Sequence, residues 1–433
     1  METREHIRQP LEQSVSRRHA FHRKVFYFLC LLVAFFIPVH PRILPPLIAL
    51  MVLNWLVDGQ FIRIFPALFR DRQRRRTLAL SLIWFLYLAG MLWSVNLEYG
   101  WFDLQVKLSL LVFPLLFATT DKDLFDTAKI RCLFFSFVAG CFAGSLLLLG
   151  NSAIQYFVNG IPGAFYYRNL SWFFHPGYIA MYYIFSLAII AWSLLGSASP
   201  LPGWFKITAV FLLFWFFVLV ILLSSKAGIL GMILVAFLAS GYIVISRKQY
   251  VRGILVLAGF AVLLAAGLWT MPYAVQRIGR AGEVVRAGRP ADPGLVDGTA
   301  ERMEVWKASL EVIRDHHVLG TGTGDVKDEL IGKYSRDGME GAFSQKLNAH
   351  NQYLQTFAAL GIGGFLVLAA MILLPFLDAI RKRDLLYLMF LLVFGLNIAV
   401  ESMLETQAGV VFYAFFNSFL LWNSQNRDPE AAS

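Results

Sequence analysis

The sequence predicts an all-α polytopic membrane protein with about twelve transmembrane helices and one large polar loop. Hydrophobic residues make up 58% of the 433 positions and charged residues only 15%, whereas about 25% of the residues in soluble domains are charged. The apolar residues gather in long runs, and a helix that crosses a bilayer needs about 20 of them. One polar interval, residues 271–349, interrupts these runs.

Twelve apolar segments are expected to cross the membrane. The first two are short and contain proline, so tilted or partly re-entrant segments are also compatible with them. A basic tail without a small-residue cleavage site precedes the first segment, which favours a retained span over a signal peptide. The expected segments are residues 25–39, 43–57, 77–95, 104–118, 132–150, 172–195, 205–223, 228–245, 253–270, 353–379, 385–400 and 406–422.

The placement of lysine and arginine predicts the orientation of these segments. More than half of the 38 basic residues fall in the two tails and in alternate connections, which the positive-inside rule assigns to the cytoplasm. The net charge of +10 therefore reflects cytoplasmic anchoring, and it does not indicate nucleic-acid binding, which needs a basic face on a soluble domain. The predicted organisation is a cytoplasmic basic tail at 1–24, nine spans within 25–270, a periplasmic loop with amphipathic helices at 271–349, three spans within 350–423 and a cytoplasmic tail at 424–433.

The long loop contains helical signals of its own. A turn-rich stretch, 290–294, comes first, and an amphipathic helix is expected over 299–317. A Gly-rich run, 320–324, ends that helix, and a second short helix is expected over 325–334. The apolar residues that recur at helical spacing on the first helix are Met303, Trp306, Leu310 and Ile313.

His350 is the first candidate for chemistry. Asn348 is expected to cap the tenth span, which places His350 in the first turn of that helix. The positive end of the helix disfavours the imidazolium, so the ring is expected to stay neutral and able to accept a proton. An ordinary polar residue at a helix start is the competing interpretation.

Three cations are predicted to face the same compartment as His350. They are Arg168, Lys226 in a tight turn between two spans, and Arg302 in the amphipathic helix. Taken singly, Lys226 also fits a side chain that reaches for lipid headgroups, and the arginines fit ordinary surface charges. Taken together, they suit a diphosphate at the membrane surface, because arginine can bind two phosphate oxygens at once.

The remaining polar candidates carry weaker signals. His175 precedes a proline at a helix start, and Glu401 is expected to pair with an arginine on the outer face or to bind an acceptor hydroxyl. The run 320–324 lacks the Lys-Ser/Thr ending of a nucleotide-binding loop. Cys30, Cys132 and Cys141 lie in apolar runs without metal-ligand spacing, so neither a disulfide framework nor a metal site is expected.

Five short motifs occur in order along the chain. They are SKAG at 225–228, RMEVW at 302–306, LGTGTG at 319–324, HNQYL at 350–354 and GIGG at 361–364. Taken together, these motifs resemble the signature of the O-antigen ligase and polymerase superfamily, with Lys226 where arginine is common in the family. The twelve-span layout with a large periplasmic loop before the tenth span is similar to that family as well.

The resemblance implies a periplasmic active site in which an essential His350 acts on a glycan linked to undecaprenyl diphosphate. It implies that Arg302, Lys226 and Arg168 bind the diphosphate, and it implies no metal, cofactor or nucleotide. The expected partners are the undecaprenyl-diphosphate-linked donor, a lipid A–core acceptor and the lipids of the bacterial inner membrane. Candidates for acceptor binding or support are Glu401, His175 and Asn351.

Several functions remain open at this stage. Ligation to lipid A–core, with inversion at the anomeric carbon, is the preferred reading. Polymerisation of repeat units and transfer to a protein hydroxyl share the donor chemistry and differ in the acceptor. A lipid or polysaccharide transporter is the alternative of another class, and it predicts internal repeats and ionisable residues deep in the membrane. No such repeat is evident in the sequence.

Overall fold

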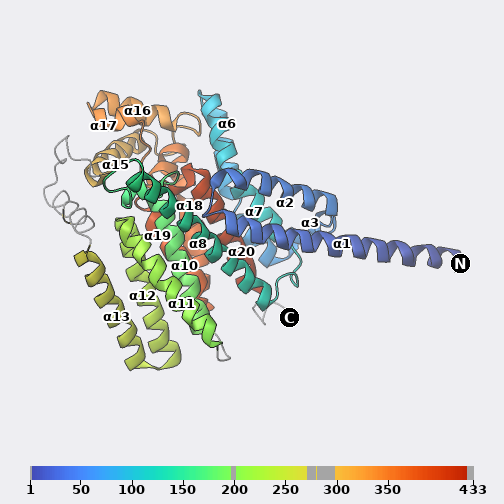
Figure 1. The fold of residues 1–433 in the computed structure, drawn as a ribbon. Helices are drawn as coiled ribbons and strands as arrows, with labels where there is room; N and C mark the ends of the chain where they lie inside the picture. Colours follow the sequence, from blue (N-terminus) through green and yellow to red (C-terminus); the bar gives the residue numbers. More distant parts are fainter. Residues whose placement is uncertain (1, 197–200, 271–278, 280–297, 427–433) are drawn as a thin grey trace. The chain divides into compact units, whose positions relative to one another are not determined.

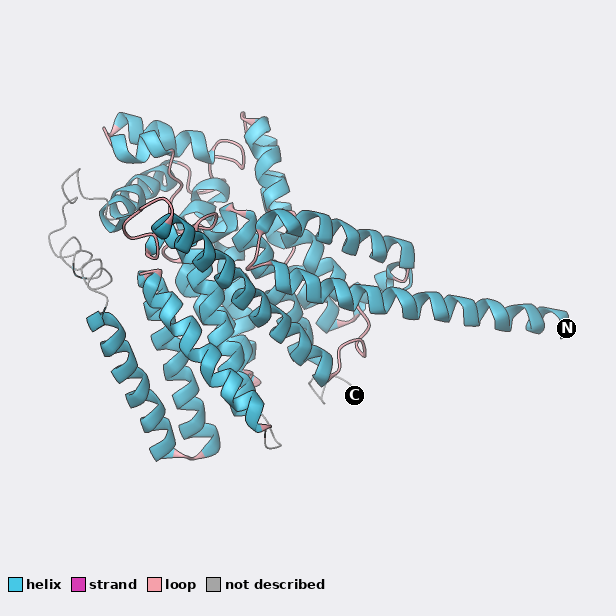
Figure 2. Cartoon of the chain, viewed as in Figure 1, coloured by secondary structure: helices cyan, strands magenta, loops and turns pink. Residues whose placement is uncertain are grey.

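The computed structural model describes residues 2–196, 201–270, 279 and 298–426. Every regular element in this part of the chain is a helix, which confirms the all-α prediction (Figure 2). Ten helical segments are long and apolar enough to cross a membrane, and Leu385–Ile398 is a shorter apolar helix. The last of the twelve expected segments forms a 20-residue helix, Gln407–Asn426, whose residues 409–424 are all buried. The expected turn at 290–294 lies outside the described residues.

The chain divides into two compact units. Unit 1 comprises residues 1–81, 109–145 and 414–433, and unit 2 comprises residues 82–108 and 146–413. Helices α8 (Thr127–Phe157) and α20 (Gln407–Asn426) contribute to both units. The other elements of unit 1 are α1 (Glu2–Phe36), η1 (Pro41–Ile43), α2 (Leu44–Asp58), α3 (Phe61–Arg70), α4 (Arg72–Ala79) and α7 (Ser109–Ala118).

Small residues on α8 let α1 pack closely against it in unit 1. A Cβ atom added at Gly140 would lie 2.0 Å from the Phe35 carbonyl oxygen, so any larger residue there would force the helices apart. The Ser136 hydroxyl donates to the Leu31 carbonyl at 2.8 Å and adds a polar link. Close backbone approach of this kind is how helices associate in lipid, where hydrophobic burial gives little driving force between them.

Charged residues join three segments of unit 1. The His19 ring contacts Asp58 through Nδ1 at 2.9 Å and Asp121 through Nε2 at 2.8 Å. Arg23, one turn further along α1, pairs with Asp123 at 2.8 Å. These contacts tie α1 to the end of α2 and to the connection between α7 and α8.

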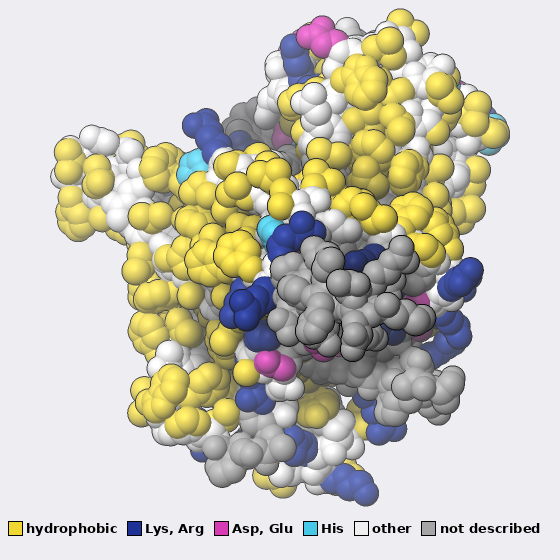
Figure 3. Space-filling model, turned by 90° about the vertical axis from the view of Figure 1, so that its right-hand side faces the viewer, with side chains coloured by type: hydrophobic (Ala, Val, Ile, Leu, Met, Phe, Trp, Pro, Cys, Tyr) yellow, Lys and Arg dark blue, Asp and Glu magenta, His cyan; other side chains and the backbone are white. Residues whose placement is uncertain are grey.

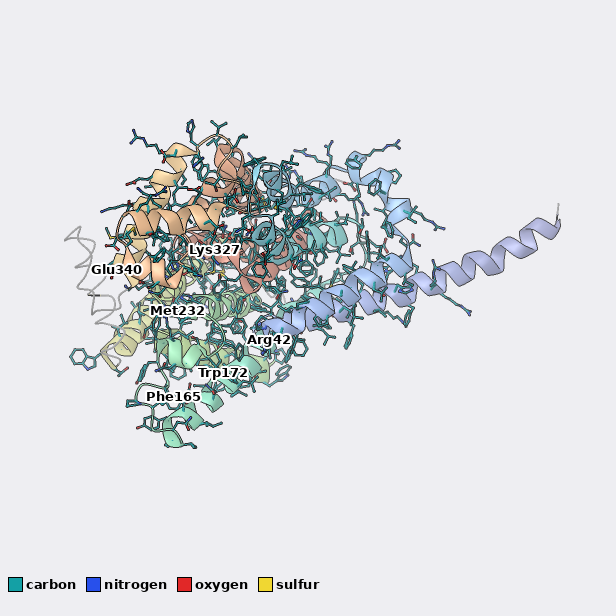
Figure 4. All side chains as sticks on the ribbon, turned by 90° about the horizontal axis from the view of Figure 1, so that it is seen from above. Arg42, Phe165, Trp172, Met232, Lys327 and Glu340 are labelled. Atoms are coloured by element: carbon teal, nitrogen blue, oxygen red, sulfur yellow. The ribbon has the colours of Figure 1, made fainter. Side chains whose placement is uncertain are left out.

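Unit 2 is built around α10 (Pro176–Gly196), most of whose residues are buried. Met232, which Figure 4 labels on α12, is also buried in this bundle. The other elements of unit 2 are α5 (Leu82–Gly90), η2 (Met91–Trp93), α6 (Leu97–Val106), α9 (Tyr167–Ser171), α11 (Gly203–Leu222), α12 (Lys226–Arg247), α13 (Tyr250–Thr270), α15 (Gly298–Asp315), α16 (Val326–Arg336), α17 (Glu340–Gln345), α18 (Gln352–Arg381), α19 (Leu385–Ile398) and η3 (Met403–Glu405).

The described part of the long loop forms α15, α16 and α17, which pack together in unit 2 (Figure 1). Both helices expected from the sequence are present, as α15 and α16. The buried face of α15 agrees with the expected one at Ile313 and differs at Leu310, which is 54% exposed, whereas Val305, Ala308 and Val312 are buried. The buried residues of α15 are mainly small or β-branched, which allows the helix to pack closely against its neighbours.

The Gly-rich run 320–324 has a structural role in the fold. The Thr321 and Gly322 N–H groups donate to the carbonyls of Ala358 and Ala359 at 2.8 and 3.0 Å. Those carbonyls are accessible because α18 breaks at Gly361, where φ is +62°. Gly320 has φ +74°, and a Cβ atom there would lie 2.4 Å from the backbone of Ala359. Glycine is therefore required on both sides of this junction.

Apolar side chains cover much of the surface shown in Figure 3. Ile207 on α11, Val251 on α13 and Trp269 on α13 are 74%, 72% and 88% exposed. Large exposed apolar surfaces of this kind need a nonaqueous neighbour. They agree with helices that face lipid.

Candidate functional site

The ends of several helices meet at one cavity in unit 2. His175 precedes α10, Lys226 begins α12, and Glu401 follows α19. Arg302 reaches the same cavity from α15. The cavity holds about 300 Å³, and its lining is mostly apolar. Segments that lie far apart in the sequence thus place a small set of polar groups around one apolar space.

His350 lies just before α18 in an unusual backbone conformation. Its φ is +44°, a region that residues with a Cβ atom rarely adopt. The expected cap at Asn348 is wrong. Asn351 is the N-cap, and its Oδ1 accepts from the N–H groups of Tyr353 and Leu354 at 2.9 and 3.1 Å. Asn348 accepts instead from the His350 N–H at 3.0 Å, so His350 lies before the first helical turn.

Two further hydrogen bonds stabilise the segment around His350. The Trp306 indole N–H donates to the His350 carbonyl at 3.3 Å. The side-chain Nδ2 of Asn351 donates to the Ala399 carbonyl at 2.9 Å. The start of α18 is thereby joined to α15 and to the end of α19. Neither His350 nor Asn351 lines the cavity. His350 contacts the lining residue Glu401, and Asn351 positions the histidine.

The carboxylate of Glu401 bridges His350 and Arg302. Its Oε1 lies 2.8 Å from His350 Nδ1, and its Oε2 accepts from Arg302 Nη2 at 3.0 Å. A carboxylate can only accept, so His350 Nδ1 carries the proton and Nε2 is the free basic atom of the neutral ring. In the described part of the chain no contact to Nε2 is recorded.

Glu401 is held in its charged form. Burial opposes ionisation of this carboxyl, but the hydrogen bond from His350 and the charge of Arg302 outweigh it and lower its pKa to about 2. The carboxylate therefore orients the ring of His350 and would stabilise the imidazolium if Nε2 took up a proton.

His175 is a second, neutral imidazole at the cavity. Burial disfavours its charged form, and although Glu401 offsets part of this effect, the pKa falls to about 4. Its Nδ1 accepts from the Gly177 N–H at 3.2 Å, so the ring proton lies on Nε2. At neutral pH His175 offers a hydrogen-bond donor without a charge.

Lys226 is positioned by the turn that starts α12. Ser225 caps this helix, since its Oγ accepts from the Gly228 N–H at 3.1 Å. Lys226 Nζ donates to Thr299 Oγ1 at 2.5 Å, which links α12 to the start of α15. The ammonium group and the positive end of the helix both favour an anion in the cavity.

Arg168 is the one predicted diphosphate ligand that the structure does not bring to the cavity. Its side chain is exposed, and its guanidinium lies 5.8 Å from the ring of Tyr167. Tyr167, with φ +50°, lines the cavity in its place. Sequence reasoning also missed Thr299, Trp306 and Asn397. Their residue types are too common near membrane surfaces to be singled out without the fold.

A second ion network lies buried in unit 2, and the sequence analysis missed it. Lys107 is fully buried and contacts both Asp103 and Glu405, the latter at 3.1 Å. Glu405 Oε1 also accepts from Gln352 Nε2 at 3.1 Å. The Lys107 ammonium lies 4.6 Å from the centre of the Tyr87 ring. None of these residues lines the cavity beside Glu401.

The site has no set of residues suited to a metal ion within the described chain. Cys30, Cys132 and Cys141 are free thiols. The groups available for chemistry are therefore a histidine–carboxylate pair, a neutral histidine and two cations. The apolar helices define a multi-pass membrane protein, and these groups lie at or beside its cavity, where they are chemically able to exchange a proton and to bind an anion.

Residues 209–369 match the family model Wzy_C, described as O-Antigen ligase. The match includes Lys226, Arg302 and His350 and ends before Glu401. It confirms the resemblance seen in the sequence motifs and supports assignment of the chain to the O-antigen ligase superfamily, whose members are ligases or polymerases. No curated protein matches the chain.

Proposed function

We propose that this protein transfers a glycan from undecaprenyl diphosphate to lipid A–core oligosaccharide at the periplasmic face of the bacterial inner membrane. The observation that carries this proposal is the hydrogen-bonded series His350–Glu401–Arg302 beside a cavity that also receives Lys226. The family match supports the general class of reaction, a ligase or polymerase acting on lipid-linked glycans.

His350 acts as the general base in this proposal. Its Nε2 takes the proton from an acceptor hydroxyl while the hydroxyl oxygen attacks the anomeric carbon of the donor. The oxygen–carbon bond forms as the bond from carbon to the diphosphate breaks, so one displacement inverts the anomeric centre. Glu401 stabilises the imidazolium that results.

Arg302 and Lys226 stabilise the leaving diphosphate. Both line the cavity, and among its lining residues in the described part of the chain Glu401 is the only carboxylate. An excess of positive charge is thus in place before the reaction begins, where negative charge grows on the leaving group. Such preorganised charge is a large contribution to catalysis in sites that exclude water.

The apolar lining suits a lipid-linked donor. Leu230 lines the cavity and is 51% exposed on α12, so the cavity reaches the apolar surface of that helix. A polyprenyl chain can remain in the bilayer while its diphosphate enters between Lys226 and Arg302. This route needs no passage of the lipid through water.

A transporter is expected to have ionisable groups within the membrane, because such groups usually mark a transport path. The buried network around Lys107 is a set of this kind. Its charges, however, are satisfied by one another and lie apart from the cavity lining. We therefore regard transport as the weaker alternative.

The test is glycan transfer by purified protein in lipid nanodiscs, with an undecaprenyl-diphosphate-linked glycan and a lipid A–core acceptor. We expect transfer to lipid A–core by wild type, and a loss of about 100-fold or more for His350→Gln, as expected when a general base is removed. His317→Gln is the matched control, because His317 is exposed at the end of α15 and should tolerate the change.

Extension of the donor glycan by itself would identify a polymerase, and transfer to a protein hydroxyl would identify an oligosaccharyltransferase. Either result would keep the donor chemistry and refute the proposed acceptor. A folded wild type that performs none of these transfers, together with full activity of His350→Gln in cells, would refute the enzymatic proposal and lead to a transport assay.

A further inference from the structure

Two buried polar atoms at the cavity lack a hydrogen-bond partner among the described residues. They are the side-chain oxygen of Asn397, Oδ1, and the Nε of Arg302. Both residues line the cavity. Buried polar groups in folded proteins are almost always paired, so two unpaired atoms at one cavity indicate a ligand that supplies both partners.

The orientation of the Asn397 amide follows from its other hydrogen bond. Its Nδ2 donates to the Val393 carbonyl at 2.8 Å. A carbonyl oxygen can only accept, so the nitrogen must point to Val393, and the oxygen is the atom left unpaired. Asn397 is 1% exposed, which leaves the cavity as the space from which a partner can reach it.

The two atoms require partners of opposite kind. Asn397 Oδ1 accepts hydrogen bonds only, so a phosphate oxygen, itself an acceptor, would be repelled there. A hydroxyl or an acetamido N–H would pair with it. Arg302 Nε donates only, and a phosphate oxygen is its natural partner. A molecule with a phosphate beside a hydroxyl or amide satisfies both.

We propose that Asn397 determines specificity by binding the sugar directly attached to the donor diphosphate, accepting a hydrogen bond from a hydroxyl or acetamido N–H of that sugar. This inference rests on the proposed function and extends it from the diphosphate to the first sugar. That sugar is covalently joined to the group that Arg302 and Lys226 bind, so it must occupy the same small cavity. The acceptor, by contrast, has to approach Nε2 of His350.

The test measures equilibrium binding of two lipids to the full protein in nanodiscs. One lipid is undecaprenyl diphosphate, and the other is undecaprenyl diphosphate that carries N-acetylglucosamine. The variants are Asn397→Leu, which has nearly the same shape without the oxygen, and Asn397→Ala, which introduces no new bulk. Ser186→Ala is the matched control, because the Ser186 hydroxyl is also buried without a recorded partner but lies outside the cavity.

We expect both Asn397 variants to bind the sugar-bearing lipid about tenfold more weakly, as for the loss of one hydrogen bond, and to bind the sugar-free lipid as wild type does. Arg302→Lys should weaken both lipids, and Ser186→Ala neither. The thermal unfolding midpoint of each variant should match wild type, which separates lost binding from lost folding.

The inference would be overturned if the Asn397 variants bound both lipids normally, since a water molecule would then satisfy the oxygen. Equal weakening of both lipids would overturn it too. These outcomes leave the proposed function standing if wild type still transfers glycan. A wild type that binds the sugar-bearing lipid selectively yet transfers nothing would refute the proposed function and retain the sugar site, whereas binding of neither lipid would refute both.

Discussion

Glu401 and Glu405 lie in the same short connection of unit 2 and have different surroundings. Glu405 faces Lys107 and Gln352, and its side chain is 8% exposed. Glu401 faces His350 and Arg302, and its side chain is 9% exposed. The two carboxylates are equally buried, so burial alone does not separate a structural group from a functional one.

The difference lies in the partners. The network of Glu405 is closed, because the Lys107 ammonium is fully buried and contacts two carboxylates. The network of Glu401 is open, because Arg302 has an unpaired Nε and a side chain that is 27% exposed. A closed network fixes the connection between α19 and α20, and an open one has capacity left for a substrate. The comparison indicates where to look for function in other buried ion networks.

The largest expected effect is a loss of stability when the Lys107 ammonium is removed from the closed network. Lys107→Met leaves Asp103 and Glu405 buried without their cation, and breaking a buried ion pair in this way costs about 3–5 kcal/mol. We expect a large fall in the thermal unfolding midpoint and in the yield of folded protein. Both are measured in detergent against wild type.

The control for that variant removes all three charges together. Lys107→Met combined with Asp103→Leu and Glu405→Gln should recover most of the lost stability, because no uncompensated charge remains. A Lys107→Met protein as stable as wild type would contradict the closed network and would suggest that these groups reach water.

A smaller effect is the contribution of His175, at the open site, to the pH dependence of the protein's stability. The pKa of His175 is lowered to about 4 in the folded protein, whereas a histidine in an unfolded chain titrates near its ordinary value of about 6.5. As pH falls between these values the unfolded chain binds a proton that the folded one does not, so stability falls. The neighbouring charged or titratable groups are Glu401, Arg302, His350 and Arg168.

The measurement follows the unfolding midpoint of wild type and His175→Phe from about pH 7 to pH 5. Wild type should lose more stability than the variant over this range. Glu401 is ionised in both states above its ordinary pKa of 4.5, so it does not contribute there. Equal slopes for the two proteins would show that His175 is not held neutral.

The sequence predicted the helices and four of the residues that line the cavity, Lys226, Arg302, His175 and Glu401. It also predicted His350, which contacts Glu401. Lys226, Arg302 and His350 were identifiable because the positive-inside rule assigns a side to each connection. The same rule does not say where in the plane of the membrane a residue lies. It therefore could not reveal that Arg168 lies on the exposed side of its short helix. Periodicity likewise indicated a helix over 299–317. It assigned Ile313 correctly to the buried face and Leu310 wrongly.

Other features depended on contacts between distant segments. The pairing of His350 with Glu401 joins residues about fifty positions apart, and that of Lys107 with Glu405 joins residues about three hundred apart. No local pattern reports such pairs. The cap at Asn351 in place of Asn348 also depends on tertiary contacts, because Asn351 bonds to the end of α19.

The most direct test of the account compares Glu401→Gln with Glu405→Gln in one experiment, with kcat for glycan transfer and the unfolding midpoint measured on the same preparations. We expect Glu401→Gln to lower kcat by about 100-fold, the lower end of what a positioned acid–base system contributes, while its midpoint stays near that of wild type. Glu405→Gln should keep its kcat and change only the midpoint. Full activity of Glu401→Gln, or an equal loss of kcat in both variants, would contradict the distinction between the open and the closed network.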